Sequence, residues 1–290
     1  MKYIKSRNDI VLSDYDSFII SQTLECGQCF RFEKLEEENY VVIAFGRILN
    51  IYQDGNSIVF KNTSAKDFED IWIKYFDLER DYNNIKETIS KNDSVLEEAI
   101  SYAPGIRIIS QERFECLISF IISQNNRIPM IKKVIENISV KFGKYIGSFM
   151  GKDYYSFPIP CELSKADVES LMECKTGFRA KYIMDAVDKV LNKKIDLSVD
   201  DKTEVLRENL MSIKGVGNKV SDCVLMFSYG KVETFPTDVW IKRIMSELYF
   251  DGIDTSINDI HKLAQENFGQ YAGYAQQYLF NYARQFEIGV

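Results

Sequence analysis

The spacing of apolar residues changes near Ser64, and this change constrains the fold more than any other feature. Before it, short segments rich in β-branched and aromatic residues alternate with turns such as Asp54-Gly55-Asn56, which is typical of strands. After it, apolar residues recur three and four positions apart nearly to the end of the chain, which is typical of amphipathic helices. We therefore expect an α+β, mostly α fold, with a small antiparallel β domain at residues 1–75 and a helical body at residues 76–290.

The expected elements follow from these two periods. The strand-like segments are residues 27–32, 40–45, 47–53 and 57–62. The helical patterns cover residues 68–76, 83–91, 94–103, 115–124, 129–143, 165–174, 180–191, 202–213, 219–230, 238–250 and 275–286. No run of about 18 apolar residues occurs, so no membrane span is predicted. The N-terminus lacks the apolar stretch of a secretory signal, so we expect a cytoplasmic protein, associated with the nucleoid if the chain is bacterial.

The composition narrows the chemistry. The chain has six cysteines and a single histidine, His261. Cys26 and Cys29 have the spacing of half a zinc site, but no second pair and no nearby histidine completes it. We therefore expect reduced thiols, no metal and no cofactor, and chemistry that uses lysine, carboxylate or cysteine. The net charge of −7 argues weakly against nucleic acid, but lysines and arginines of the later part of the chain permit a local DNA-binding face.

The segment Ile213–Cys223, IKGVGNKVSDC, joins two helical patterns through Gly215-Val216-Gly217. Glycines permit a tight turn there, and Asn218 is a favourable N-cap for the next helix. The backbone N–H groups at such a helix start are suited to bind a phosphate. The alternative is a tight connector that binds no ligand.

Lys219 shares one helix face with Cys223, Met226 and Phe227. A lysine among sulfur and aromatic groups is partly desolvated, which favours the neutral and nucleophilic amine. In the alternative reading, the lysine stem covers apolar surface and its charge pairs with Asp222.

Asp238 follows Pro236-Thr237 at the start of the helical pattern DVWIKRIMSELYF. The simplest account of this aspartate is an N-cap that the helix dipole favours. It is also a rigidly held carboxylate, which helix packing can bring close to Lys219.

Together, the hairpin, Lys219 and the segment Pro236–Val239 resemble the helix-hairpin-helix DNA glycosylase superfamily, in which a lysine and an aspartate form the catalytic pair. Three further segments resemble its 8-oxoguanine DNA glycosylase/AP lyase family: GQCFRF (Gly27–Phe32), SQNNRIP (Ser123–Pro129) and YAGYAQQYLF (Tyr271–Phe280). Each segment alone has a plainer explanation, as an edge strand, a helix C-cap and helix core respectively. The likeness spans nearly the whole chain.

Two other branches of the superfamily fit less well. The endonuclease III branch usually carries clustered C-terminal cysteines for an iron–sulfur cluster, and this chain has no cysteine after Cys223. The alkylation-repair branch typically keeps the aspartate but lacks the lysine, so Lys219 argues against it.

The resemblance implies a base excision repair enzyme whose active site lies between two helical subdomains. Lys219 would attack C1′ of the sugar, Asp238 would stabilise the positive charge there, and a Schiff base would permit β-elimination. The damaged base would be flipped out of the duplex into a pocket. The residues that the resemblance places against the base are Gly27, Cys223, Phe227, Gln276 and Phe280. The Gly27 carbonyl would accept a bond from N7–H of 8-oxoguanine and repel N7 of guanine, which is an acceptor.

The resemblance also implies a DNA-binding face and a double-stranded DNA partner that contains 8-oxoguanine. Asn125 would fill the space beside the opposite cytosine, Phe178 would act as a wedge, and Arg179 would read the cytosine. The residues implied to contact DNA are Asn125, Asn126, Phe178, Arg179, Gly215, Val216, Gly217 and Trp240. A monomer is the default expectation.

Three positions depart from the eukaryotic pattern. Met130 stands where those relatives have a second arginine that contacts cytosine, Trp240 replaces a histidine near a phosphate, and Phe178 replaces a tyrosine. We therefore predict a relaxed preference for cytosine opposite the lesion. Two alternatives stay open: a glycosylase of the same superfamily for another damaged or alkylated base, and a non-catalytic DNA-binding module.

Overall fold

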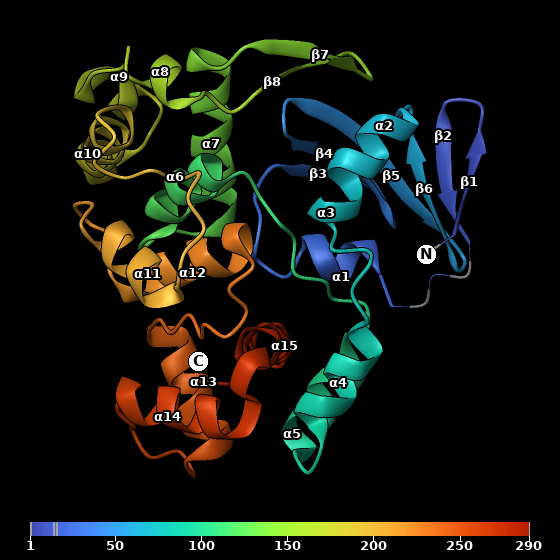
Figure 1. The fold of residues 1–290 in the computed structure, drawn as a ribbon, viewed down its shortest axis with the longest axis vertical. Coiled ribbons are helices and arrows are strands. Elements are labelled where there is room, and N and C mark those ends of the chain that lie inside the picture. The colour runs from blue at the N-terminus through green and yellow to red at the C-terminus, as the bar shows by residue number, and fades with distance from the viewer. Residues whose placement is uncertain (1, 14, 16, 290) are drawn as a thin grey trace.

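The structure is a computed structural model that describes residues 2–13, 15 and 17–289. Its N-terminal part contains an antiparallel sheet with the strand order β1-β2-β6-β5-β4-β3, and helices form most of the rest (Figure 1). The strands are β1 (Tyr3–Ser6), β2 (Asp9–Leu12), β3 (Phe32–Glu36), β4 (Asn39–Ala44), β5 (Arg47–Asp54) and β6 (Ser57–Lys61). The predicted fold class is confirmed. The division between residues 75 and 76 stays a prediction.

The helices follow the predicted apolar period in most places. They are α1 (Ile20–Leu24), α2 (Ala65–Asp67), α3 (Ile73–Tyr75), α4 (Tyr82–Ser90), α5 (Ser94–Tyr102), α6 (Arg113–Ser123), α7 (Ile128–Phe142), α8 (Pro160–Leu163), α9 (Val168–Glu173), α10 (Ala180–Leu191), α11 (Thr203–Met211), α12 (Asn218–Tyr229), α13 (Val239–Tyr249), α14 (Ile257–Phe268) and α15 (Ala272–Gln285). A π-helical turn joins α2 to α3, and 3-10 turns precede α10 and α15. None of the described helices is long and apolar enough to cross a membrane.

The two faces of the sheet bury different side chains, because residues alternate across a strand. On one face, Val42 lies opposite Leu49, and both belong to a core that includes Phe68 and Trp72. On the other face, Val41 and Ile43 pack against Tyr154.

Tyr154 belongs to a hairpin that the apolar spacing did not predict. The strands β7 (Tyr145–Phe149) and β8 (Lys152–Tyr155) interrupt the helical body and pair with each other. Figure 1 shows this hairpin reaching from α7 over the sheet. The expectation of an all-helical body was therefore wrong at this point, because two strands of so few residues show little periodicity.

Other local predictions were also wrong. Residues 27–31 form a loop, and the edge strand β3 begins only at Phe32. The elements β1, β2, α1, α2, α8 and α14 were not predicted. In α14 only Ile260, Ala264 and Phe268 are buried, so most of its sequence reads as polar.

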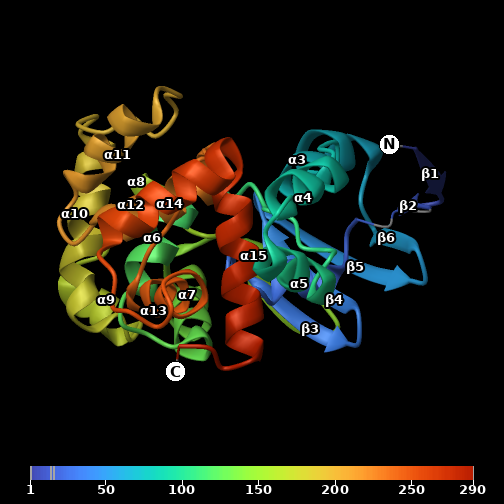
Figure 2. The ribbon, with the colours of Figure 1, turned by 90° about the horizontal axis from the view of Figure 1, so that it is seen from below.

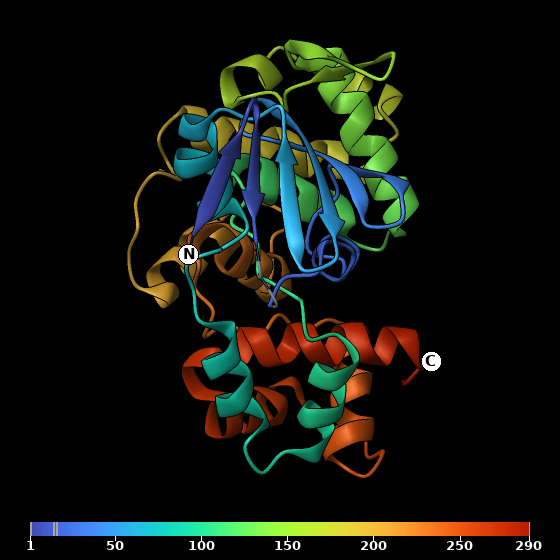
Figure 3. The ribbon, with the colours of Figure 1, turned by 90° about the vertical axis from the view of Figure 1, so that its right-hand side faces the viewer.

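The helices form two groups that meet along α15. Figure 1 shows α4, α5, α13, α14 and α15 below, with α6–α12 above them. In the view of Figure 2, α15 separates the sheet and α3–α5 on one side from α6–α14 on the other, and Figure 3 shows α4 and α5 against α15 below the sheet. Buried residues of α4, α5 and α15 belong to the main helical core, so an early segment of the chain is packed against its last helix.

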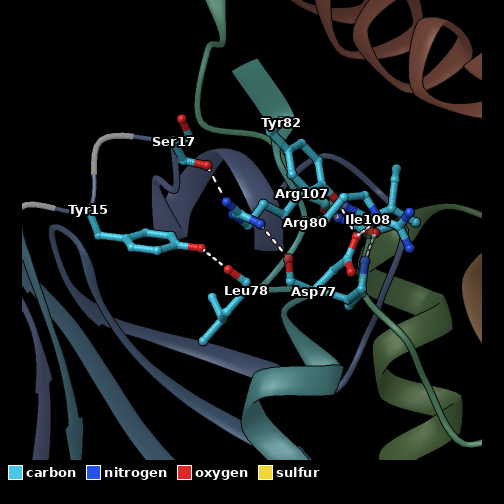
Figure 4. A network of polar contacts seen from close by, with 10 residues as sticks. Tyr15, Ser17, Asp77, Leu78, Arg80, Tyr82, Arg107 and Ile108 are labelled. Carbon is cyan, nitrogen blue, oxygen red and sulfur yellow. Dashed lines mark hydrogen bonds and ion pairs between the residues drawn. The ribbon is translucent and has the colours of Figure 1, made fainter. Parts of the chain in front are cut away.

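A buried arginine joins the sheet side to the helices (Figure 4). Arg107 is 2% exposed, and its guanidinium lies over the rings of Tyr15 and Tyr82 at 5.0 Å and 4.2 Å. It donates to the carbonyls of Ser17, at 3.0 Å, and Asp77. Because a buried charge needs such partners, the network fixes the backbone at residue 107, on which the loop before β3 rests.

Candidate active site

A small recess lies where α6, α12, α13 and α15 meet the loop before β3. Its volume is about 60 Å³. Its walls include both expected catalytic residues and all five residues expected to contact a base. The lining residues are Gly27, Phe120, Lys219, Cys223, Phe227, Pro236, Asp238, Ile241, Gln276, Gln277 and Phe280.

The helix α12 presents Lys219, Cys223 and Phe227 to the recess. Lys219 is half-buried, and its Nζ lies 5.3 Å from the centre of the Phe120 ring. Burial raises the pKa of the Cys223 thiol to about 11, although the charge of Lys219 opposes this shift. Cys223 is therefore a neutral thiol near pH 7. Met226, expected on the same face, instead lines a separate cavity.

The suggested pairing of Lys219 with Asp222 is wrong. Asp222 is buried, and its Oδ1 accepts a hydrogen bond from Nε of Arg207 at 2.8 Å. Burial raises the pKa of this carboxyl group, and Arg207 opposes the rise. Within the described part of the chain, no carboxylate lies at ion-pair distance from Lys219, so its amine stays available.

Asp238 also lines the recess and caps α13. Its Oδ1 accepts a hydrogen bond from the backbone N–H of Ile241 at 2.8 Å, which confirms the predicted N-cap. The bond orients the carboxylate, and no described residue donates a hydrogen bond to its other oxygen. Capping and a position beside Lys219 are therefore compatible.

Aromatic rings that sequence reasoning missed support Lys219. Phe120 of α6 stacks on Phe227 with ring centres 5.5 Å apart and planes at 12°. Phe30 contacts the Phe120 ring edge-on, with ring centres 5.8 Å apart. Phe120, Pro236, Ile241 and Gln277 also line the recess and were not predicted. Nothing in the apolar run of α6 distinguishes Phe120 from ordinary core residues.

Gly27 forms the part of the recess that faces α15. Its φ of +89° is a conformation that favours glycine, and an added Cβ would lie 3.1 Å from Cε1 of Phe280. The Phe280 ring is half-buried. A side chain at position 27 would therefore strain the loop and crowd this ring.

Gln276 contributes an unusual polar atom. The residue is 6% exposed, and its Oε1 has no hydrogen-bond partner among the described residues. A buried acceptor without a partner is costly. Its position on the recess wall therefore points to a ligand that donates a hydrogen bond.

A groove of about 390 Å³ continues from the recess and shares Lys219 and Asp238 with it. It extends to Asn125, at the end of α6, and to Gly217, at the start of α12. Lys219 and Asp238 therefore line the same groove as Asn125 and as Gly217 of the hairpin.

Arg179 holds the loop that carries Asn125. Its guanidinium donates to the carbonyls of Gln124 and Asn125, both at 2.9 Å, and to that of Thr176 at 3.3 Å. Burial lowers the pKa of Arg179, and no carboxylate of the described chain pairs with it. Asn125 is exposed and has a φ of +47°, as expected for an asparagine at a helix end.

Two more predicted DNA contacts lie beside this loop. Phe178 is 56% exposed, and the Arg179 guanidinium lies 4.5 Å from the centre of its ring. Asn126 is half-buried, and its side chain donates to the carbonyl of Ile122 at 3.2 Å. Trp240, in the first turn of α13, instead packs partly against the main helical core, outside both the recess and the groove.

The hairpin requires glycine at only one of its two glycine positions. Gly215 has a φ of +78°, and an added Cβ would lie 2.4 Å from the Tyr182 ring. At Gly217 no atom lies within 4 Å of an added Cβ. Val216 between them is buried in the core. Gly217 itself is the N-cap of α12, so the prediction that Asn218 caps this helix was wrong.

Comparison with known proteins identifies the family of the chain. Residues 10–117 match the 8-oxoguanine DNA glycosylase N-terminal domain, and residues 118–270 match the HhH-GPD superfamily of base excision DNA repair proteins. A probable N-glycosylase/DNA lyase of Methanothermobacter thermautotrophicus is 30% identical over 77% of this chain and 76% of its own length. The N-glycosylase/DNA lyase OGG1 of Arabidopsis thaliana is 28% identical over 89% of this chain and 75% of its own length.

Solved structures resemble the chain over almost its entire length. MBOgg1 in complex with a low-affinity DNA ligand is 46% identical, with a TM-score of 0.95 over 99% of this chain and 100% of that one. The Clostridium acetobutylicum 8-oxoguanine glycosylase/lyase, in complex with double-stranded DNA containing cytosine opposite 8-oxoguanine, is 40% identical, with a TM-score of 0.94 over 99% of both chains. The chain therefore belongs to the HhH-GPD superfamily of base excision DNA repair proteins, within its 8-oxoguanine DNA glycosylase family of bifunctional N-glycosylase/DNA lyases.

Proposed function

We propose that Lys219 is the nucleophile of an enzyme that excises 8-oxoguanine from double-stranded DNA. After loss of a proton, its amine attacks C1′ of the sugar, the N-glycosidic bond breaks, and the base leaves with the bonding electrons. Asp238 stabilises the positive charge that develops at the sugar. The observation that carries the proposal is one recess that unites Lys219, Asp238 and the unpartnered Oε1 of Gln276.

The C1′–O4′ bond then breaks, O4′ gains a proton and the nitrogen loses one, so the sugar ring opens and the attached amine becomes a Schiff base. A proton-accepting group (a general base) removes a proton from C2′. The 3′ phosphate then leaves by β-elimination, which nicks the strand. Hydrolysis of the Schiff base releases Lys219. This sequence uses residues of the chain and water, and it requires no cofactor and no metal.

The polar atoms of the recess fit a guanine-type base. On its Watson–Crick edge, such a base carries N–H donors that can satisfy Oε1 of Gln276. Phe280 would stack on one face of the base and the neutral Cys223 thiol on the other, with Phe227 behind. The Gly27 carbonyl would accept N7–H of 8-oxoguanine, a bond that guanine does not offer.

The recess must widen before it holds a base. Its volume of about 60 Å³ has room for only a few water molecules, since one water needs at least about 10–15 Å³. Phe280 is the half-buried ring on the wall, so we propose that its movement admits the flipped base.

The groove beside the recess would hold the DNA. We propose that Asn125 fills the gap left by the flipped nucleotide, with Asn126 supporting the loop and Phe178 wedging the opposite strand. Arg179 has five N–H donors, and four bonds to carbonyls are present, so one donor remains for the opposite cytosine. Gly215 and Gly217 would place backbone N–H groups against a phosphate. The N–H of Val216 already donates to the carbonyl of Ile213 at 3.1 Å, so Val216 would only hold the two glycines apart. Trp240 would lie near another phosphate. The enzyme would act as a monomer.

Borohydride trapping tests this function. The wild type and Lys219→Gln are incubated with a duplex that carries one 8-oxoguanine, and sodium borohydride reduces any Schiff base. We expect a covalent protein–DNA adduct with the wild type and none with the variant. No adduct and no base release by a folded wild type that still binds the duplex would refute the proposal and favour another lesion or a binding module.

A further inference from the structure

The backbone carbonyls of the residues next to Gly27 accept hydrogen bonds from side chains, whereas the carbonyl of Gly27 does not. Gln277 Nε2 donates to the carbonyl of Cys26 at 2.9 Å, and Arg284 Nη2 donates to that of Glu25 at 2.6 Å. The carbonyl of Gln28 accepts a bond from Gln111 at 2.8 Å. No described residue donates to the carbonyl of Gly27.

The opposite side of the loop is equally fixed. Gln28 is fully buried, and its side chain donates to the carbonyl of Arg107 at 2.6 Å and accepts from the N–H of Ile109 at 2.9 Å. Arg107 is held by the network of Figure 4. Hydrogen bonds therefore hold the residues on either side of Gly27: Gln28 is bonded to the segment 107–111, and Cys26 is bonded to α15.

Gln277 is positioned for this role by the helix that also forms the base pocket. It is 2% exposed and lines the recess, as do its neighbour Gln276 and, one turn later, Phe280. One rigid helix thus carries the residue that would stack on the base and the residue that bonds the Gly27 loop. Any shift of the loop relative to α15 would move the free carbonyl relative to the base.

We propose that Gln277 is a specificity-determining positioning residue, with Arg284 as its outer support; the proposal rests on the proposed function of the same recess. These two residues, the Gly27 clamp, hold the loop so that the free carbonyl meets N7 of the base. Without the clamp the carbonyl can move away, and the repulsion from guanine and the bond to 8-oxoguanine both weaken. The attack by Lys219 at an abasic site needs neither.

The test compares two activities of the same preparations. The variants are Gln277→Met, which keeps the length of the side chain without the donor, and Arg284→Met, at the more exposed end of α15. Gln265→Met changes an exposed glutamine on α14 and is the control. Single-turnover excision of 8-oxoguanine and strand cleavage at a preformed abasic site are measured for each, with thermal unfolding as the check on folding.

For Gln277→Met we expect excision of 8-oxoguanine to fall about tenfold, the scale of one net hydrogen bond, while abasic-site cleavage stays within about twofold. Arg284→Met should lower the ratio of 8-oxoguanine excision to abasic-site cleavage by about threefold. The expected loss is smaller because the hydrogen bond of Arg284 is more exposed. In a Lys219→Gln background, the affinity ratio between duplexes with 8-oxoguanine and guanine should fall about tenfold for Gln277→Met.

Several results would contradict the proposed role of Gln277 and Arg284. One is unchanged excision and affinity ratio in both variants, with excision by the wild type intact. Another is an equal loss of excision and abasic-site cleavage in a folded variant, which would assign Gln277 to general assembly of the site. If Gln277→Met fails to fold, Arg284→Met decides. A wild type that cleaves abasic sites but never excises 8-oxoguanine would instead refute the proposed substrate, and the clamp's role with it.

Discussion

His261 Nε2 lies 3.0 Å from Oγ1 of Thr237, which links the single histidine of the chain to the residue directly before Asp238. Burial lowers the pKa of His261, while Asp222 opposes this shift and Arg207 adds to it. The backbone of Phe235 also bonds the ring and opposes the shift. The neutral imidazole is therefore the form that supports the loop before α13.

This link predicts a loss of stability in acid. Because the folded pKa is lower than the ordinary 6.5, the unfolded chain binds a proton first as the pH falls. The contribution of His261 is complete above pH 6.5 and is lost as the pH falls through the folded pKa. Since the group is partly solvated, we expect an effect on the free energy of unfolding below about 1 kcal/mol. Urea unfolding between pH 8 and pH 5 should show a shallower decline for His261→Gln, and parallel curves would contradict the assignment.

Two substitutions at Asp238 should separate capping from chemistry. Asparagine retains a side-chain oxygen for the Ile241 N–H, so Asp238→Asn should change stability by only a few tenths of a kcal/mol, whereas Asp238→Ala should cost about 1 kcal/mol. Both remove the negative charge, and we expect excision to fall about 100-fold or more in each. Thermal unfolding and single-turnover kinetics measure the two effects. Full activity in Asp238→Asn would show that the carboxylate serves only as a cap.

The two hairpin glycines provide a matched pair of variants. Gly215→Ala forces a side chain into a φ of +78° and against Tyr182, so it should destabilise the protein by about 1–3 kcal/mol. Gly217→Ala meets no atom within 4 Å and should change stability by less than about 0.5 kcal/mol. If a phosphate approaches this hairpin, Gly217→Ala should still weaken DNA binding. Unchanged affinity, measured by fluorescence anisotropy, would remove the hairpin from the DNA interface.

Met130 offers a gain-of-function test of opposite-base reading. Its side chain is 44% exposed, and a thioether lacks the hydrogen-bond donors that recognise cytosine. We expect excision by the wild type to differ little among the four opposite bases. Met130→Arg should raise the preference for cytosine about tenfold, the low end of one directed base contact. A strong cytosine preference in the wild type would show that Arg179 alone suffices.

Much of the fold follows from local spacing, whereas the missed parts depend on contacts distant in sequence. The strand patterns at 40–45, 47–53 and 57–62 correspond to β4, β5 and β6. The hairpin β7–β8 could not be recognised because its stability depends on Tyr154 packing against Val41 and Ile43, which are far away in the chain. The N-cap at Asp238 is a local device and was recognised.

The candidate site shows the same division. Lys219, Cys223 and Phe227 follow one another about one helical turn apart on α12, so it could be inferred that they lie on one face. Phe120 and Gln277 reach the recess through helix packing, and no local pattern marks them. The roles of the predicted residues in catalysis and DNA binding stay predictions until the variants are measured.

The hydrogen bond between Gln277 and Cys26 joins residues that are 251 positions apart. A ribosome makes the Gly27 loop early and Lys219 later, and it adds α15 after both. A nascent chain without α15 would thus carry Lys219 without Gln276 and Phe280, the residues expected to recognise the base. Under the proposed roles, the order of translation would delay assembly of the recess until α15 has been made and packed, and would separate the appearance of the proposed nucleophile from the ability to select a lesion.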